Sequence, residues 1–190
     1  LRVSVQVGDC AWGTADVPCG SSIGTHEVVD LRDGDMRFGG SGVRKAIHSI
    51  HDRLRPELLG RDATHQREVD LLMVELDGTP DKSGLGANAI LGVSLAVARA
   101  AALACHLPLF RYLSCDAHVL PVPEASLING GMHADNELEM QEYCVIPVGA
   151  PSASEAVRWL SEVFYALHDV LRGRSGSTGN FGEDGGFAPS

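Results

Sequence analysis

The chain has 190 residues, of which 44% are hydrophobic and 21% are charged, and its formal net charge is −10 at pH 7. This is long enough for one large or two small domains with a real core, and the composition is ordinary for a globular protein. The acidic balance argues against a nucleic-acid-binding surface, and no apolar run approaches the roughly 20 residues that span a bilayer.

The cysteines and the first residues indicate a reducing compartment. The five cysteines are scattered without a CxxC pair, which argues against a disulfide framework or a zinc site. The opening LRVSVQV lacks the charged and then apolar layout of a secretory signal. We therefore expect a cytoplasmic protein.

The first half of the chain predicts a strand, a loop and two helices. Leu1–Val7 alternates apolar and polar residues, as half-buried strands do. The small, glycine-rich stretch Cys19–Glu27 predicts a loop. Val43–Leu54 and Arg67–Leu76 have the spacing of amphipathic helices, and a segment containing Pro56 separates them.

Gly86–Leu107 predicts a third, buried helix. Its residues are apolar nearly all round the helix, and many of them are small. Such a helix is buried, or packs closely against its neighbours. Pro108 marks its end.

After Ser114 the pattern changes to short apolar runs. His118–Pro123 and Glu142–Val148 are typical of strands that are covered on both faces. This change predicts a domain boundary near Asp116, with one domain over residues 1–116 and another over residues 117–190.

A long helix and a glycine-rich turn close the chain. Ser152 and Glu155 match a capping box, and the helical spacing behind them continues to Gly173, which we expect to end the helix. The motif GEDGG at Gly182–Gly186 is expected at the end of a strand.

Five blocks of this sequence together resemble the enolase family, the glycolytic phosphopyruvate hydratases. The blocks are Val17–Asp35, Leu76–Ala100, Leu120–Asn136, Met140–Ala150 and Gly182–Ser190. They occur in the family's order and with family-like spacing, and the resemblance covers essentially the whole chain.

The resemblance implies an α+β cap domain followed by the first strands and helix of an α/β barrel of the TIM type. Residues 1–116 correspond to the cap without its first residues, and residues 117–190 to the truncated opening of the barrel. Family members run to more than twice this length, so we expect an N-terminal fragment that is inactive alone. The full-length parent is expected to be a homodimer.

The resemblance also implies a reaction. Enolases dehydrate 2-phosphoglycerate to phosphoenolpyruvate by removing a proton beside a carboxylate, and Mg²⁺ stabilises the resulting ene-diolate. The family's base lysine and its three main carboxylate ligands match no residue here. Ser22 in CGSSIG matches the loop serine that binds the second Mg²⁺, and an oxygen ligand suits this hard cation.

Three further residues match the substrate side of the family's site. His133 in NGGMH matches a histidine near the substrate phosphate. Gln141 matches a substrate-side glutamine, and Glu142 matches a glutamate that assists acid catalysis. Neighbours on a strand face opposite ways, so both side chains reach one site only near the strand's end.

The closing acids stand in an unusual order. The family motif reads Gly-Asp-Glu-Gly-Gly and its glutamate is the proton donor, whereas this chain has Glu183 followed by Asp184. Asp184 takes the donor position with a side chain shorter by one methylene, about 1.5 Å. A misplacement of about 1 Å can lower a rate roughly 10²-fold. On a regular strand Glu183 would point the other way.

Three functions remain open at this point. The first is a plain enolase. The second is a paralogue such as carboxyphosphonoenolpyruvate synthase, which joins phosphonoformate to 2-phosphoglycerate, because residues such as Met132 and Glu124 depart from the family pattern near the substrate. The third is a non-catalytic enolase-like binding protein, because the GEDGG motif is altered.

Overall fold

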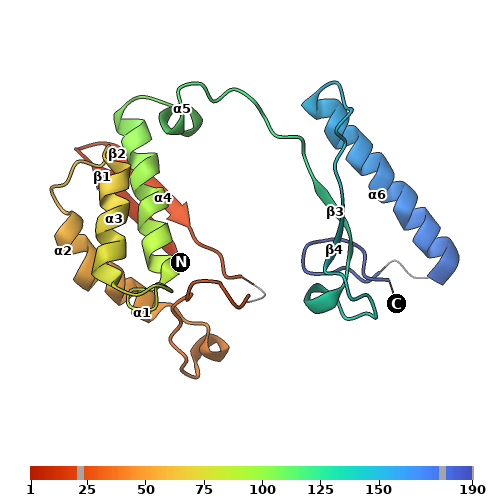
Figure 1. The fold of residues 1–190 in the computed structure, drawn as a ribbon, viewed down its shortest axis with the longest axis horizontal. Helices are drawn as coiled ribbons and strands as arrows, with labels where there is room; N and C mark the ends of the chain where they lie inside the picture. Colours follow the sequence, from red (N-terminus) through yellow and green to blue (C-terminus); the bar gives the residue numbers. More distant parts are fainter. Residues whose placement is uncertain (21–23, 176–178, 190) are drawn as a thin grey trace. The chain divides into compact units, whose positions relative to one another are not determined.

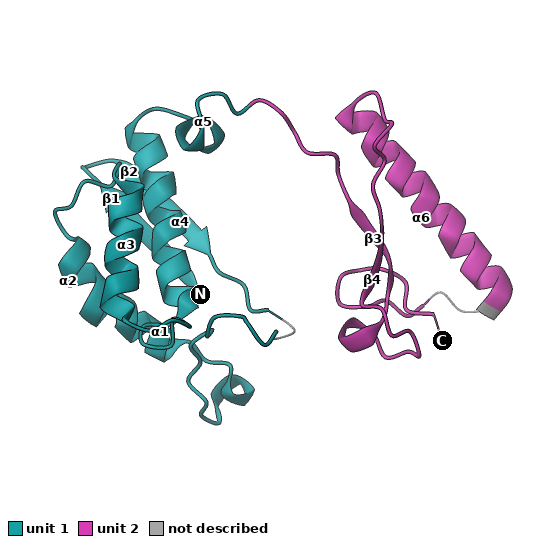
Figure 2. Ribbon diagram, viewed as in Figure 1, with its two compact units in different colours: residues 1–117 teal, residues 118–190 magenta. Residues whose placement is uncertain are grey.

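The computed structural model describes residues 1–20, 24–175 and 179–189. Its contacts divide the chain into two compact units, Leu1–Ala117 and His118–Ser190 (Figure 2).

A β-hairpin opens unit 1. Strand β1 (Arg2–Val7) pairs antiparallel with β2 (Ala11–Asp16), which confirms the strand predicted at the start of the chain. Strand β2 was not predicted from the sequence. Every buried position of this strand carries alanine or glycine, and these residues have low β-propensity.

The helices of unit 1 follow the predicted periodicity. The predicted helix Val43–Leu54 is present but longer, because it continues through Pro56. The proline lies in α2 (Arg55–Leu58), directly after the π-helical segment η2 (Ser49–Leu54), and a π-helical turn is one place where a helix takes up a break in its i→i−4 hydrogen bonds. The bounds are η1 (Arg37–Gly40), α1 (Arg44–His48), the π-helical segment η2 (Ser49–Leu54), α2 (Arg55–Leu58), α3 (Gln66–Asp77), α4 (Ala87–Ala104) and α5 (Leu109–Leu113).

Helix α4 is the centre of unit 1, as its composition predicted. It packs against both strands of the hairpin and against α3, and Figure 1 shows α3 and α4 side by side. Its length and hydropathy would suit a membrane span, but 56% of that window is buried inside the unit. This burial is typical of the core helix of a globular protein.

The core of unit 1 collects apolar side chains from the hairpin, from three helical segments and from the turn before α4. Its largest fully buried members include Leu54, Met73 and Leu85. On the hairpin side the packing is closer, because small residues face each other. The buried Gly13 of β2 lies directly against the backbone of α4 at Ala96 and Ala100.

Unit 2 contains a second antiparallel pair and a long helix. Strand β3 (Ala125–Asn129) pairs with β4 (Glu142–Val145), and a register irregularity lies between Ser126 and Ile128. The short 3-10 helix η3 (Gly131–His133) follows β3, and helix α6 (Ala153–Ser175) packs on that strand.

Two predicted strands of unit 2 need correction. His118–Pro123 is not a strand: it has no strand pairing, and Val119 and Leu120 are 81% and 76% exposed. Its two prolines lack N–H donors, so pairing begins only after them. The predicted strand Glu142–Val148 ends at Val145, two residues before another proline.

The start of α6 is as predicted, but its end is not. The backbone N–H of Glu155 donates to Ser152 Oγ at 3.2 Å, which is the cap that the sequence indicates. The helix passes Gly173 and continues to Ser175, so this glycine does not end it. A single helical glycine costs only about 1 kcal/mol.

The closing motif Gly182–Gly186 is a turn between two bridge positions, and not the end of a regular strand as expected. Phe181 and Phe187 form an antiparallel bridge, and Phe187 also bridges Ile128 of β3. Inside the turn, Gly185 N–H donates to the Gly182 carbonyl at 3.1 Å. Phe187 is buried and stacks on Phe164 of α6, which anchors the turn on unit 2.

Candidate active site

The residues that the sequence analysis singled out in unit 2 lie on three neighbouring segments. These are η3 with the glycine before it, the beginning of β4 and the closing turn. Two glycines bring the first two segments together: Gly130 N–H donates to the Gln141 carbonyl at 3.0 Å, and Gly131 N–H donates to the Leu138 carbonyl at 2.7 Å. A Cβ at Gly130 would lie 2.5 Å from the Met140 carbonyl oxygen, so only glycine permits this approach.

His133 and Asp184 meet directly. The imidazole Nδ1 contacts a carboxylate oxygen of Asp184 in an ion pair, and the histidine side chain is only 8% exposed. The backbone adds a second link, because Glu183 N–H donates to the His133 carbonyl at 2.9 Å. The closing turn is therefore attached to η3 at two adjacent points.

The surroundings of His133 favour its charged form. The hydrogen bond that the His133 ring donates to Asp184 raises the pKa of His133 above its ordinary value of 6.5, although burial opposes this change. The negative charges of Asp184, Glu183 and Glu142 raise the pKa further. The site thus combines one buried imidazole with three carboxylates.

This arrangement predicts a pH dependence of stability. Because the folded-state pKa of His133 is raised, the stabilisation from its charged form is fully present below the unfolded-state pKa of about 6.5 and is lost as pH rises through the folded value. We expect the urea midpoint of the whole protein to be higher than that of its His133→Gln variant. The difference should be largest at acidic pH. A difference that stays constant or grows with rising pH would contradict this expectation.

Glu142 and Gln141 are placed differently. Glu142 is half-buried, begins β4 opposite Asn129, and lies close enough to His133 to raise the pKa of that histidine. Gln141 is exposed, and its backbone carbonyl takes part in the loop contact with Gly130. The structure therefore joins Glu142, but not the Gln141 side chain, to the cluster around His133.

Asn129 belongs to the site and was missed by the sequence analysis. It is fully buried at the end of β3, and its side chain contacts both Asp184 and the Gly186 backbone. A polar residue at the end of a buried apolar run, directly before two glycines, was the available signal. Buried amides normally have hydrogen-bond partners, so this position required some.

The two departures from the family pattern also have defined positions. Met132 is exposed on η3. Glu124 contacts Cys144 of β4; burial raises the pKa of this thiol, and the hydrogen bond and charge of Glu124 raise it further. Both residues therefore lie beside the segments that carry the site.

The predicted metal ligand Ser22 lies outside the described residues. Across 1–20, 24–175 and 179–189, no three His, Cys, Asp or Glu side chains are grouped so that they could hold a metal ion. The donor set of this part of the chain therefore does not fit a complete magnesium site.

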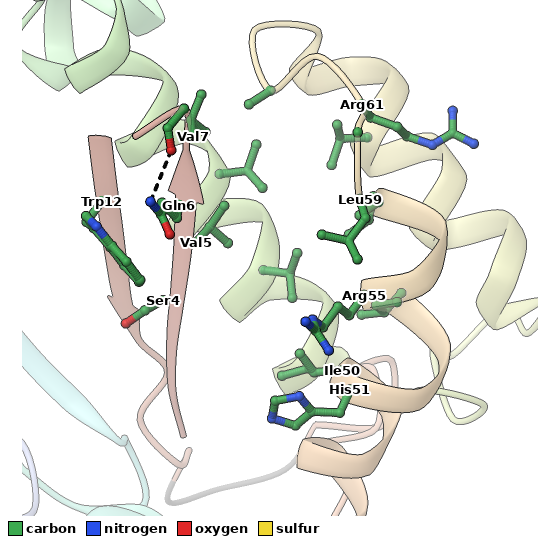
Figure 3. Close-up of a pocket in the computed structure, with 18 residues that line it drawn as sticks. Ser4, Val5, Gln6, Val7, Trp12, Ile50, His51, Arg55, Leu59 and Arg61 are labelled. Carbon is green, nitrogen blue, oxygen red and sulfur yellow. Dashed lines mark hydrogen bonds between the residues drawn. The ribbon is translucent and has the colours of Figure 1, made fainter. Parts of the chain in front are cut away.

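A cavity of about 690 Å³ lies elsewhere, within unit 1 (Figure 3). It separates β1 from the η2–α2 helical run, and its lining is largely aliphatic. Trp12, Ile50 and Leu59 contribute to that lining, together with His51 and Arg55. None of the candidate site residues lines it, so the cavity and the His133 cluster are separate features.

Comparisons with known proteins cover both units. Residues 1–113 match the family model described as "Enolase, N-terminal domain", and residues 117–190 match "Enolase, C-terminal TIM barrel domain". A curated relative named "Enolase" from Acidothermus cellulolyticus is 52% identical over 191 residues, which cover 100% of this chain and 44% of the relative.

Two further relatives carry the same name. The protein from Thermococcus gammatolerans is 54% identical over 179 residues, covering 93% of this chain and 42% of the relative. The protein from Mycobacteroides abscessus is 52% identical over 190 residues, covering 100% of this chain and 44% of the relative. The chain thus spans less than half the length of the curated relatives that it matches.

Proposed function

Since this chain belongs to the enolase family, as its N-terminal domain and the start of its TIM barrel domain, we propose that it is part of a phosphopyruvate hydratase. The whole protein would be a lyase that converts 2-phosphoglycerate to phosphoenolpyruvate and water. The observation that carries this proposal is the 52–54% identity to three relatives named "Enolase", which extends over 93–100% of the chain.

The cluster around His133 supports an acid–base role for the closing turn. The reaction removes a proton from C2 and hydroxide from C3, so an acid must protonate the departing hydroxyl. We assign this donor to Asp184, which lies beside the buried imidazole and would pass to the departing hydroxyl the proton that the His133–Asp184 pair holds, leaving His133 neutral. Glu142 would assist it, and Glu183 would add negative charge that favours the protonated form of His133.

The substrate is a small phosphorylated acid, and a cationic imidazole is suited to its negative groups. We propose that His133 binds the substrate phosphate and that Gln141 completes the substrate side when its exposed side chain turns inward. A protonated imidazole donates from both ring nitrogens. One of them is held by Asp184, and the positive charge of the ring would attract the substrate phosphate.

We propose Mg²⁺ as a cofactor of the whole protein, and not of the part that this chain spans. Mg²⁺ prefers oxygen ligands, so Ser22 would supply one, and carboxylates from regions that this chain does not span would supply the others. When bound, the ion would stabilise the negative charge of the enolate.

We further propose that the whole protein is a cytoplasmic enzyme of glycolysis and that it forms a homodimer.

The test is an assay of the whole protein with 2-phosphoglycerate. We expect phosphoenolpyruvate to form, as measured by its ultraviolet absorbance, and the rate to fall to background when a chelator removes divalent cations. No product with Mg²⁺ present would contradict the proposal. The names of the three relatives give no support to the phosphonoformate-joining or non-catalytic alternatives.

A further inference from the structure

Asn129 lies on the inside of the closing turn and is 0% exposed. Its Oδ1 accepts a hydrogen bond from Gly186 N–H at 2.9 Å. Its Nδ2 donates to Ser126 Oγ at 3.1 Å and to the Asp184 carboxylate at 3.4 Å. One amide thus contacts a serine of its own strand, the backbone of the turn and the acid that faces His133.

The turn is built closely around this amide. A Cβ at Gly182 would lie 2.3 Å from Asn129 Cβ, and a Cβ at Gly186 would lie 2.8 Å from Asn129 Oδ1. Real Cβ atoms do not approach that closely, so both glycines are needed for the turn to surround the side chain. Asn129 N–H also donates to the Phe187 carbonyl at 2.9 Å, which fixes the turn's position along β3.

The orientation of the amide follows from its partners. Gly186 offers an N–H, which needs an acceptor, so the oxygen of the Asn129 amide must face it. The NH₂ group is therefore directed to Ser126 and Asp184, where it meets oxygen atoms that can accept. A donor in this position attracts a carboxylate.

The two adjacent acids consequently have different attachments. Asp184 is held through its side chain, by Asn129 and His133. Glu183 is held through its backbone N–H, which donates to the His133 carbonyl. We propose that Asn129 is a positioning residue that selects Asp184, and not Glu183, as the carboxylate that faces His133.

The consequence for the reaction rests on the proposed function. If Asp184 is the proton donor, Asn129 acts on catalysis through it, without touching the substrate. A misplaced acid lowers the rate of the chemical step more than substrate binding, and a displacement of about 1 Å can cost roughly 10²-fold. For Asn129→Ala we therefore expect kcat to fall about 10- to 100-fold with KM little changed.

The deciding experiment measures the His133 pKa by NMR in the whole protein without substrate. Asn129→Ala should lower this pKa towards its ordinary value, because Asp184 is no longer held against the ring. The same substitution in an Asp184→Asn background should have no further effect, since Asn129 acts through Asp184. An equal shift in both backgrounds would overturn the proposal.

Asn136 provides a matched control. It is an asparagine of the loop between η3 and β4, and its Nδ2 donates to the backbone carbonyl of Asn129 at 2.9 Å, and not to the Asp184 carboxylate. Asn136→Ala should therefore leave the pKa of His133 near that of the parent. If it lowers this pKa as much as Asn129→Ala does, the effect is a general loosening of the loop, and the proposal is wrong.

A second variant covers the case in which Asn129→Ala does not fold. Asn129→Asp has the same shape and keeps an oxygen for Gly186 N–H, but it replaces the donor to Asp184 with a second carboxylate oxygen. Crystals of this variant grown at pH 8 should show the Gly182–Gly186 backbone in place and the Asp184 carboxylate turned away from His133. An unmoved Asp184 would overturn the proposal. Neither this structure nor the NMR titration requires turnover. Both therefore test the role of Asn129 independently of the activity assay that tests the proposed function.

Discussion

The Asp184→Asn variant of the whole protein is expected to lose about 10²- to 10⁴-fold in kcat for phosphoenolpyruvate formation, the range that a positioned acid or base contributes. Asparagine has the same shape and can still contact His133 and Asn129, but its amide cannot supply the proton. Since the Asp184 hydrogen bond is the main cause of the raised pKa of His133, this pKa should fall in the same variant. Steady-state kinetics and an NMR titration measure the two effects.

Glu183→Gln is the matched control for that variant, because it makes the same chemical change at the adjacent residue. Glu183 contacts the site through its backbone N–H, which the substitution leaves in place. Loss of its charge should lower the pKa of His133 only slightly and reduce kcat less than about tenfold. Equal losses in the two variants would contradict the assignment of Asp184 as the donor.

The reversed order of these acids shows what sequence reasoning could and could not supply. On a regular strand, Glu183 and Asp184 would point to opposite faces. In the structure both lie in a turn, so strand alternation does not apply to them. The contact between Asp184 and His133 joins residues 51 positions apart, and no local pattern predicts it.

The role of Asn129 could not be predicted either, because its partners are also distant in the sequence. The sequence shows a polar residue before two glycines, but its partners Asp184 and Gly186 lie 55 and 57 residues further along the chain. By contrast, the capping contact between Ser152 and Glu155 spans three residues and was predictable from spacing alone. Local rules therefore located the start of α6, but they could not identify the partners of Asn129.

The elements of the fold also divide into those that a local sequence pattern predicts and those that it does not. Helices α3 and α4 were predicted because their side chains repeat at the helical period over many residues. The apolar letters of His118–Pro123 suggested a strand, but a strand also needs N–H donors, and the two prolines lack them. Strand β2 was missed because its inward side chains are small. Their small size reflects the closeness of α4, which is a tertiary property.

The close contact between strand β2 and helix α4 predicts the largest stability effect in unit 1. Gly13→Ala is expected to destabilise the unit by about 3 kcal/mol or more, since overpacking a closed interface has a high cost. A Cβ at Gly13 would lie 2.1 Å from the Ala96 carbonyl oxygen and 2.3 Å from the Ala100 nitrogen. Urea unfolding of the whole protein, followed by a probe in unit 1, measures the effect.

Gly8→Ala is the comparison for this variant. Gly8 is in the hairpin turn with φ of 58°, and an added Cβ would meet nothing within 4 Å. Its substitution has only the conformational cost of a left-handed residue, about 1–2 kcal/mol. Gly13→Ala should therefore be clearly less stable than Gly8→Ala, and the reverse order would show that α4 can move away from the hairpin.

Rescue experiments separate a backbone clash from a side-chain clash at this interface. At Gly92 of α4, an added Cβ would lie 2.7 Å from Val3 Cγ2, an atom that Val3→Ala removes. Gly92→Ala should thus be partly rescued by Val3→Ala. Gly13→Ala should not be rescued by Ala96→Gly, because the atom that it meets there is a helix carbonyl oxygen, which every residue carries. Rescue by Ala96→Gly would mean that the helix backbone yields, and that the small residues of α4 are not required for its contact with β2.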